Sequence, residues 1–386
     1  MNASPFTSDR LPGLRKWIAL FGLCAVVLLT LIAAINYGLN PLIYSRPDMV
    51  AVAQVLMAGK NVRVSDSNID WRGIRREHIA QMRTTPDVIV FGGSRWQEAT
   101  GDSLPGYSMY TAFAQNDHLE DMMGLAQLLD QHGRLPRTLV LSVRFATFEQ
   151  LEKRVAWWWK MLAPEYLEMG KRLGVRTRPW HEWLPVEKWS GLLSLDLLIA
   201  KARRYVTQGL HWEPTDQLDD EEFDIVGTDG ALRFSRQRLR KESGDNAERS
   251  AVAKGLKDGR TRLTIDQNLV AQLPPLLDFL KERGVRVVFA QTPFHPAYYD
   301  QIEGTAYHHD LTQIESELRS IARQAGLQVI GSFDAATVGC KPSQFRDFNH
   351  GDSNCLQRIL AQVQMDAPAR PAAAQNAQPS TLKAPQ

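Results

Sequence analysis

The sequence has 386 residues, which suits one large domain or two small ones, and 44% of them are hydrophobic, enough for a proper core. Its formal net charge of +2 gives no support for a polyanion-binding role, so nucleic acid is not an expected partner. Neither a phosphate-binding loop nor a dinucleotide fingerprint is found, so no cofactor is expected.

Residues 17–37 form one uncharged apolar run, of the length that a helix needs to cross a bilayer. Three basic residues lie within 1–16 and only Arg46 follows the run closely, so the positive-inside rule places the N-terminus in the cytoplasm. A cleaved signal peptide is the alternative, but the run is long for one and no small-x-small cleavage site follows. We expect a single-pass protein of the cytoplasmic (inner) membrane with its main domain in the periplasm or otherwise outside.

The rest of the chain alternates strands and helices on both sides of one irregular region. We expect a cytoplasmic N-terminus (1–16), a transmembrane helix (17–37), a juxtamembrane stalk (38–85) with a short helix over 49–57, the first part of an α/β domain (86–147), a mainly helical insertion (148–262), the second part of the domain (263–365) and a disordered tail (366–386).

The α/β domain opens with a β-branched and aromatic run at 87–91, which predicts a short buried strand. Gly92 and Gly93 follow, and glycine lets the backbone turn sharply and a substrate approach closely. Ser94 then lies just past the carboxyl end of a parallel strand, where open α/β sheets bind their ligands. These features make Ser94 the candidate nucleophile and Gly93 a candidate part of the substrate site.

A second serine stands in the letters Gly-Asp-Ser-Leu at 101–104, which spell the motif of a large lipase and esterase family. No apolar strand leads into this motif, and Pro105-Gly106 follows where a helix should start. Ser103 is therefore the weaker candidate.

Two more strands are expected in the first part of the domain, at 107–112 and 137–143. Asn116 or Asp117 is a suitable N-cap for the helix that follows the first of them. Arg144 emerges at the carboxyl end of the second. In a doubly wound sheet the loop with Asn116 and Asp117 should lie beside Ser94.

The insertion is rich in tryptophan, with six of the ten between Trp157 and Trp189. These side chains either stack on sugar rings or simply pack the insertion, contact the membrane or contact a partner, and the second interpretation is the simpler one.

The alternation resumes with a helix over 269–280, which Pro274-Pro275 should kink or restart, and with a clear strand at 285–291. His295 follows that strand and either lines the cleft or is an ordinary loop histidine. A helix around 314–322, a short strand at 327–330 and a last helix over 353–363 complete the domain.

The loop before the last helix contains Asp347-Phe-Asn-His350, in which a carboxylate and an imidazole are three residues apart. A neutral imidazole can take the proton of a serine hydroxyl, and a carboxylate can hold that imidazole in the correct tautomer. Asp347 and His350 are therefore the candidate partners of Ser94. Cys340 and Cys355 bracket this loop and are either two free thiols or, outside the cytoplasm, a disulfide. They form no zinc set with His350, and no metal site is expected.

On these residues the chain resembles the SGNH hydrolase superfamily, whose members include GDSL-type esterases. It is most similar to the membrane-anchored, exported branch that serves alginate O-acetylation and teichoic-acid D-alanylation. The matching segments are Val90-Phe-Gly-Gly-Ser94, Ala290-Gln-Thr-Pro-Phe-His-Pro296 and Phe345-Arg-Asp-Phe-Asn-His350. The resemblance implies a three-layer flavodoxin-like sandwich with a central parallel sheet, Ser94 as nucleophile, His350 as base and Asp347 as the residue that orients it.

The chain departs from the family pattern at the oxyanion hole, which usually uses the serine amide, a glycine after the second strand and an asparagine after the third. Neither of the last two is present, and Asn116 and Arg144 are the nearest substitutes. The loss of one such donor typically lowers the rate by about a hundredfold or more.

Two functions follow. The first is an anchored serine hydrolase or O-acyltransferase acting on acyl esters of an envelope or exported polysaccharide, with a membrane-bound O-acyltransferase as a candidate partner. The second is a non-catalytic component of the same fold that binds glycan or a partner in a polysaccharide-modification complex.

Overall fold

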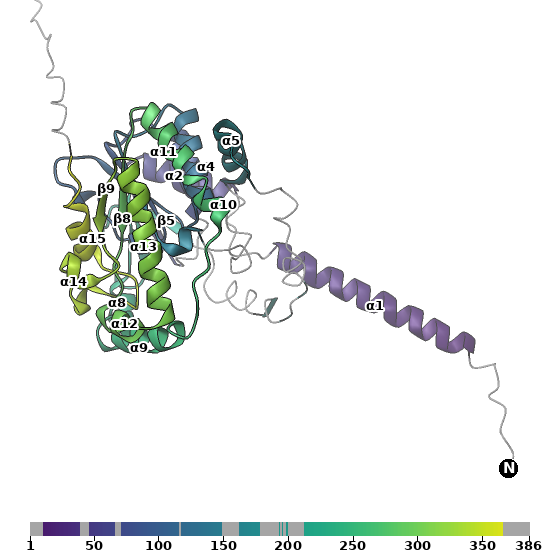
Figure 1. Ribbon diagram of the computed structural model, residues 1–386. Helices are drawn as coiled ribbons and strands as arrows, with labels where there is room; N and C mark the ends of the chain where they lie inside the picture. The colour runs from purple at the N-terminus through teal and green to yellow at the C-terminus, as the bar shows by residue number, and fades with distance from the viewer. Residues whose placement is uncertain are drawn as a thin grey trace, which may run out of the picture.

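The computed structural model describes residues 11–38, 46–65, 71–115, 117–148, 162–177 and 212–365, together with positions 193, 195, 198 and 199. The described part of the chain begins with α1 (Leu11–Gly38), a single long helix (Figure 1). Its segment Lys16–Ile35 is apolar and long enough to cross a membrane, and most of its described side chains are exposed. This exposed apolar helix is consistent with a membrane anchor or a signal sequence.

The protein is an α/β fold built on a five-stranded parallel sheet. The strands are β2 (Val88–Gly92), β3 (Met109–Phe113), β4 (Thr138–Ser142), β8 (Arg286–Gln291) and β9 (Gln328–Gly331), and their spatial order is β3-β2-β4-β8-β9. All residues of β2, β3 and β4 are buried, as expected for strands covered on both faces. Within the sheet this order is 2-1-3-4-5, the flavodoxin-like order, so the predicted fold class is confirmed.

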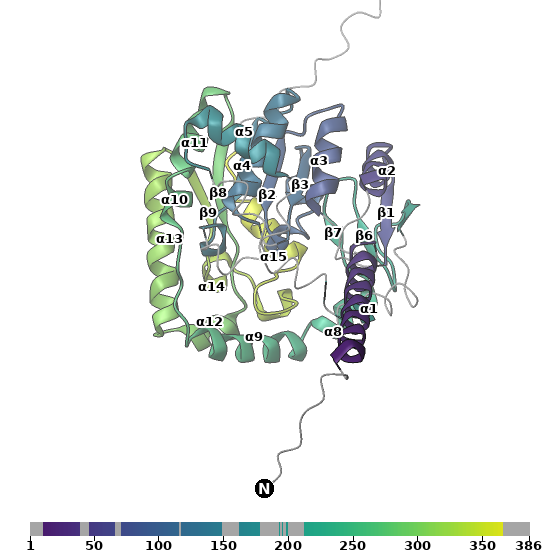
Figure 2. The same ribbon diagram turned by 90° about the vertical axis from the view of Figure 1, so that its right-hand side faces the viewer.

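Helices cover both faces of the parallel sheet and make it the middle of three layers (Figures 1 and 2). One face packs against α4 (Leu119–Gln131), α5 (Ala163–Leu173), α10 (Gln267–Val270), α11 (Leu273–Glu282) and α13 (Ala306–Gln324). The other face packs against α14 (Ala335–Val338) and α15 (Ser353–Leu360). At the edge of the fold, α9 (Asp245–Asp258) packs on α12 (Pro296–Ile302) and follows the short helix α8 (Arg236–Glu242).

A second, antiparallel sheet joins the region expected to be a stalk to the region expected to be a helical insertion. Its order is β5-β1-β6-β7, with β1 (Asn61–Val64), β5 (Trp212–Thr215), β6 (Asp224–Val226) and β7 (Leu232–Arg233). Two helices, α2 (Arg46–Met57) and α3 (Trp71–Gln81), contribute to its apolar core. The stalk is thus part of the folded body, and the described part of the insertion contains strands as well as helices. Its tryptophans from Trp157 to Trp189 and the tail at 366–386 lie outside the described residues.

The antiparallel sheet lies beside the β3 edge of the parallel sheet (Figure 2). The turn between β6 and β7 covers that edge, because the Thr111 amide donates to the Asp229 carbonyl over 2.8 Å. The Asp229 carboxylate accepts from the Gly101 amide over 2.8 Å, and the Leu232 amide donates to the Gln97 carbonyl over 2.6 Å. The insertion therefore protects an edge strand and braces the segment that follows Ser94.

Two local details differ from or refine the expected helices. Helix α4 is capped by His118 rather than by Asn116 or Asp117, because the Asp121 carboxylate accepts from the His118 amide in a capping box. A new helix, α11, begins at Leu273, and Pro274-Pro275 lie in its first turn. Backbone amides there have no partner within the helix, so the missing N–H of proline costs no hydrogen bond.

Candidate active site

Ser94 is placed by the end of the central strand β2. Gly93 is extended after the strand, and Ser94 begins a 3-10 turn, Ser94–Trp96, that is closed by a bond from the Trp96 amide to the Gly93 carbonyl over 3.0 Å. The Trp96 side chain is fully buried and anchors this turn against the sheet. Because β2 lies between β3 and β4, Ser94 stands at the carboxyl edge where the strand order reverses, the usual ligand site of such sheets.

Asp347 and His350 are carried by a loop between α14 and α15 that folds back on itself. The Arg346 amide donates to the His350 carbonyl over 3.0 Å, and Phe345 forms a β-bridge with Gly351. A disulfide between Cys340 and Cys355 closes the loop, with the two Cα atoms 5.3 Å apart. The two cysteines that bracket the candidate base in the sequence are thus bonded to each other.

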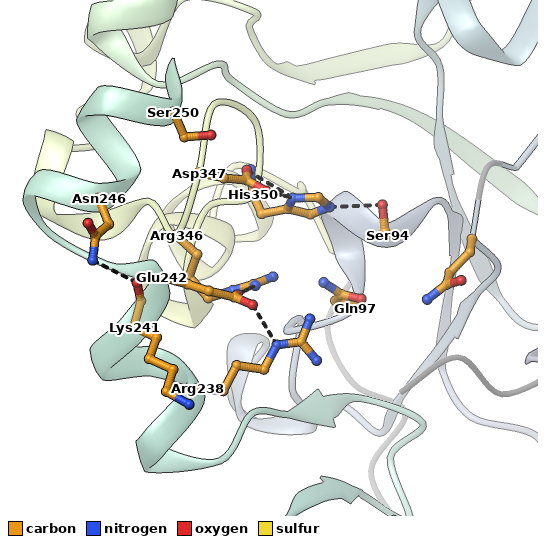
Figure 3. Close-up of a pocket in the computed structure, with 11 residues that line it drawn as sticks. Ser94, Gln97, Arg238, Lys241, Glu242, Asn246, Ser250, Arg346, Asp347 and His350 are labelled. Atoms are coloured by element: carbon orange, nitrogen blue, oxygen red, sulfur yellow. Dashed lines mark hydrogen bonds and ion pairs between the residues drawn. The ribbon is translucent and has the colours of Figure 1, made fainter. Parts of the chain in front are cut away.

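The structure brings the three predicted residues together across 256 positions of chain. The Ser94 Oγ atom lies 2.9 Å from Nε2 of His350, and Nδ1 of His350 lies 2.8 Å from Oδ2 of Asp347 (Figure 3). With a proton on Nδ1, the imidazole donates to the carboxylate and leaves Nε2 free to accept from the serine hydroxyl. The carboxylate is itself held, because its Oδ1 accepts from the backbone amides of Asn349 and His350 over 2.9 Å each.

The surroundings keep the carboxylate charged and the imidazole neutral. Burial opposes the charged form of Asp347, but the His350 ring, the Asn349 amide and Arg346 outweigh it, so the pKa of Asp347 is lowered. Burial lowers the pKa of His350 below its ordinary value; Asp347 opposes that shift, while Arg346 and Arg95 add to it. A histidine with a lowered pKa is in its basic form at neutral pH, as a proton acceptor must be.

Arg95, the residue after the candidate nucleophile, ties the serine turn to the base loop. Its Nε donates to the Asn349 carbonyl over 3.0 Å, and its guanidinium carbon lies 4.1 Å from the centre of the Phe294 ring. The side chain is buried, and this burial lowers its pKa to about 9, so it remains charged at neutral pH. One arginine therefore fixes the position of the loop that carries the imidazole.

A cavity of about 530 Å³ opens beside Ser94 and His350 (Figure 3). Every residue that lines it is polar or charged: Ser94, Gln97, Gln115, Arg238, Lys241, Glu242, Asn246, Ser250, Arg346, Asp347 and His350. Helices α8 and α9 supply one wall, so the insertion forms part of the cavity. Such a lining suits a ligand rich in oxygen and does not suit a long acyl chain.

Arg346 joins the three parts of the cavity. Its Nε donates to Glu98 over 2.6 Å and its Nη1 donates to Glu242 over 2.7 Å, while its guanidinium carbon lies 3.9 Å from the centre of the Phe234 ring. Glu98 belongs to the serine segment and Glu242 to α8, so the arginine links both to the loop of His350. This network fixes the wall that the insertion contributes.

On the other side of Ser94 stands an ion pair. The Arg144 Nη2 atom donates to Asp117 Oδ1 over 2.7 Å, and the Asp117 side chain is only 2% exposed. A Cβ added at residue 93 would collide with Asp117 Oδ1 and lie 3.0 Å from Arg144 Nη2. Glycine is therefore needed at 93 because this pair packs directly against the backbone that precedes the candidate nucleophile.

The remaining predicted site residues are placed as follows. Asn116 lies outside the described residues. His295 is buried and caps α12, with its Nδ1 accepting from the Ala297 amide over 3.1 Å, and it is not among the residues that line the cavity. Ser103 is also buried and lies away from the cavity lining, in the 3-10 turn Gly101–Ser103.

Sequence reasoning missed most of the cavity wall. Gln97 follows Ser94 by three residues, one turn of helix, and this spacing is the signal that could have found it. The residues from α8 and α9 carry no local motif, because they reach the cavity only through the packing of the insertion. Among the described residues, no group of three or more His, Cys, Asp or Glu side chains is placed to hold a metal ion.

Comparison with known protein families finds no family whose profile matches this chain, and comparison with curated proteins finds no significant match. The fold and the arrangement around Ser94 thus define an α/β protein with a hydroxyl–imidazole–carboxylate chain at the carboxyl ends of its parallel strands.

Proposed function

We propose that this protein is a membrane-anchored serine hydrolase or O-acyltransferase of the SGNH superfamily, acting on acyl esters of an envelope or exported polysaccharide. The observation that carries the proposal is the hydrogen-bonded chain from Ser94 Oγ through His350 to Asp347. The strand order and the position of Ser94 after the central strand support it.

In the proposed reaction, Nε2 of His350 takes the proton of the Ser94 hydroxyl as Oγ attacks the ester carbonyl carbon. The tetrahedral intermediate collapses as the imidazolium returns this proton to the leaving alcohol oxygen, which leaves an acyl-serine. Water or a sugar hydroxyl then loses its proton to His350 and attacks the acyl carbon, and the proton returns to Ser94 Oγ. Water gives hydrolysis, and a sugar hydroxyl gives transfer.

The cavity supports a polar carrier and a short acyl group. All its lining side chains are polar, so a long acyl chain would leave them without hydrogen bonds. The Ser94 backbone amide donates to no group in the described part of the chain, so it is available to an oxyanion. The N-terminal helix supports anchoring in the inner membrane, with the N-terminus inside and this cavity outside. A membrane-bound O-acyltransferase would then be a natural donor partner.

A second function is favoured by one observation, the Arg144–Asp117 pair beside Gly93. A guanidinium engaged by a carboxylate is a weak substitute for a free oxyanion donor. On this alternative the protein is a non-catalytic component that binds glycan or a partner in a polysaccharide-modification complex.

The test is covalent labelling by a fluorophosphonate probe, which reacts only with an activated serine. We expect the wild type to be labelled and Ser94→Ala to be unlabelled. Ser103→Ala is the matched control and should be labelled like the wild type. A wild-type protein that stays unlabelled would favour the non-catalytic component.

A further inference from the structure

Gln97 is held by its backbone on two sides. Its amide donates to the Ser94 carbonyl over 3.2 Å, and its carbonyl accepts from the Leu232 amide of β7 over 2.6 Å. The residue is only 5% exposed. Its position relative to the candidate nucleophile is thus fixed by the serine turn and by the insertion together.

The side-chain amide of Gln97 has no hydrogen-bond partner within the described residues, although the residue is almost entirely buried. Gln97 lines the cavity beside Ser94, and its amide points into that cavity toward Arg346 (Figure 3). An amide that faces the cavity and has no partner in the described part of the chain can form hydrogen bonds with a bound ligand.

Arg346 presents a second donor of the same kind. Its Nε and Nη1 are used by Glu98 and Glu242, whereas its Nη2 is buried and has no partner in the described part of the chain. Its side chain is 5% exposed, so water cannot readily satisfy this nitrogen. The buried Arg346 Nη2 atom and the cavity-facing Gln97 amide therefore belong to one polar cavity next to Ser94, and neither has an acceptor among the described residues.

We propose that Gln97 and Arg346 form the subsite for the carrier of the acyl group, a sugar or related polyol whose oxygens lie beside the ester. The guanidinium donates to one carrier oxygen. The Gln97 amide, which both donates and accepts, is matched to a hydroxyl that does the same. This inference rests on the proposed function and adds which side chains hold the alcohol portion of the ester.

The subsite explains the place of the insertion in the fold. The Leu232 amide of β7 fixes the backbone of Gln97, and Glu242 on α8 fixes the guanidinium of Arg346. The Gln97 backbone and the Arg346 guanidinium are thus held before the substrate arrives, which lowers the entropic cost of binding. The insertion acts on specificity through these contacts.

The experiment compares 6-O-acetylglucose, whose alcohol is a sugar, with p-nitrophenyl acetate, whose alcohol is not. The measured quantity is the ratio of kcat/KM for the two esters. We expect Gln97→Met to lower this ratio about tenfold, mainly through KM for the sugar ester, as one lost hydrogen bond predicts. Gln97→Glu keeps the size of the side chain but loses its donor, and it should lower the ratio as well.

Gln313→Met makes the same chemical change at an exposed glutamine on α13, where the side chain bonds Glu317 on the same helix, and it should keep the wild-type ratio. If both Gln97 variants keep the wild-type ratio while the fluorophosphonate probe still labels Ser94, the subsite is overturned and the hydrolase stands. If the wild type is not labelled and cleaves neither ester, the proposed function fails and the subsite fails with it.

Discussion

The two sides of Ser94 are built differently. On the base side, His350 lies 2.9 Å from the serine oxygen and is backed by a carboxylate in a loop that Arg95 and a disulfide hold in place. On the opposite side, the loops after β3 and β4 present the Arg144–Asp117 ion pair. The groups that would move a proton are complete, whereas the groups that would stabilise an oxyanion differ from the pattern of the family that the sequence resembles. A guanidinium is a strong donor, but its carboxylate partner competes with any oxyanion for it.

The largest effect is expected from breaking the base side at Asp347. Asp347→Asn keeps the shape of the side chain but can stabilise the wrong imidazole tautomer, so kcat/KM for p-nitrophenyl acetate should fall by about 10⁴-fold, as in other hydroxyl–imidazole–carboxylate sites. Asp352→Asn is a matched control next to the same loop, because the Asp352 carboxylate caps α15 by accepting from the Cys355 amide and has no hydrogen bond to His350 in the described part of the chain. Equal activity of the two variants would contradict the orienting role of Asp347.

The next effect tests the opposite side. If the Arg144 guanidinium stabilises the oxyanion, Arg144→Gln should lower kcat by about a hundredfold or more, the usual cost of one lost donor. The single change also leaves Asp117 buried and without its partner, which costs about 3–5 kcal/mol of unfolding free energy.

The double variant with Asp117→Asn separates these two effects. It should recover most of the stability in urea unfolding but not the rate. A double variant with wild-type kcat would show that this side of Ser94 is structural only.

The two sides also differ in how far the sequence predicts them. The strand before Gly92 and the short spacing of Asp347 and His350 are local patterns, so Ser94, Asp347 and His350 could be named from the sequence. The sequence leaves the disulfide open, and it does not predict the contact of Arg95 with the base loop. Arg144 could be named as a donor from its place after a strand, but its pairing with Asp117 could not, because the two residues meet only through the packing of separate loops.

The antiparallel sheet escaped prediction for a similar reason. Strand β1 pairs with β5 and β6, which lie some 150 residues later, and a pairing between such distant short strands leaves no local signal. The segment 38–85 consequently looks like a stalk in the sequence although much of it is folded. The cavity wall from α8 and α9 depends on the same packing, so it could not be read from motifs.

A smaller effect is expected from removing the disulfide that closes the base loop. The bridge spans a sequence separation of 15, so the double change Cys340→Ser and Cys355→Ser should lower the unfolding free energy by about 3 kcal/mol in the chain-entropy estimate. Urea unfolding of the full chain in detergent measures this. Cys24→Ser removes the free cysteine in α1 and should leave the urea midpoint unchanged. An unchanged midpoint in the double variant would mean that the loop is held by Arg95 and the β-bridge alone.

The smallest effect is a shift in the pH dependence of acylation. The pKa of His350 is lowered, first by burial and then by Arg346 and Arg95, so the acid limb of kcat/KM should lie below the ordinary histidine value of 6.5. Arg95→Met removes one cation from beside the ring while keeping an apolar contact with Phe294. Loss of a positive neighbour favours the protonated ring, so the acid limb should move to higher pH.

Arg323→Met, a change at an exposed arginine on α13, is the control and should leave the acid limb in place. If the acid limb of Arg95→Met lies at the same pH as that of Arg323→Met, the charge of Arg95 does not set the pKa of His350. The role of Arg95 is then limited to holding the loop.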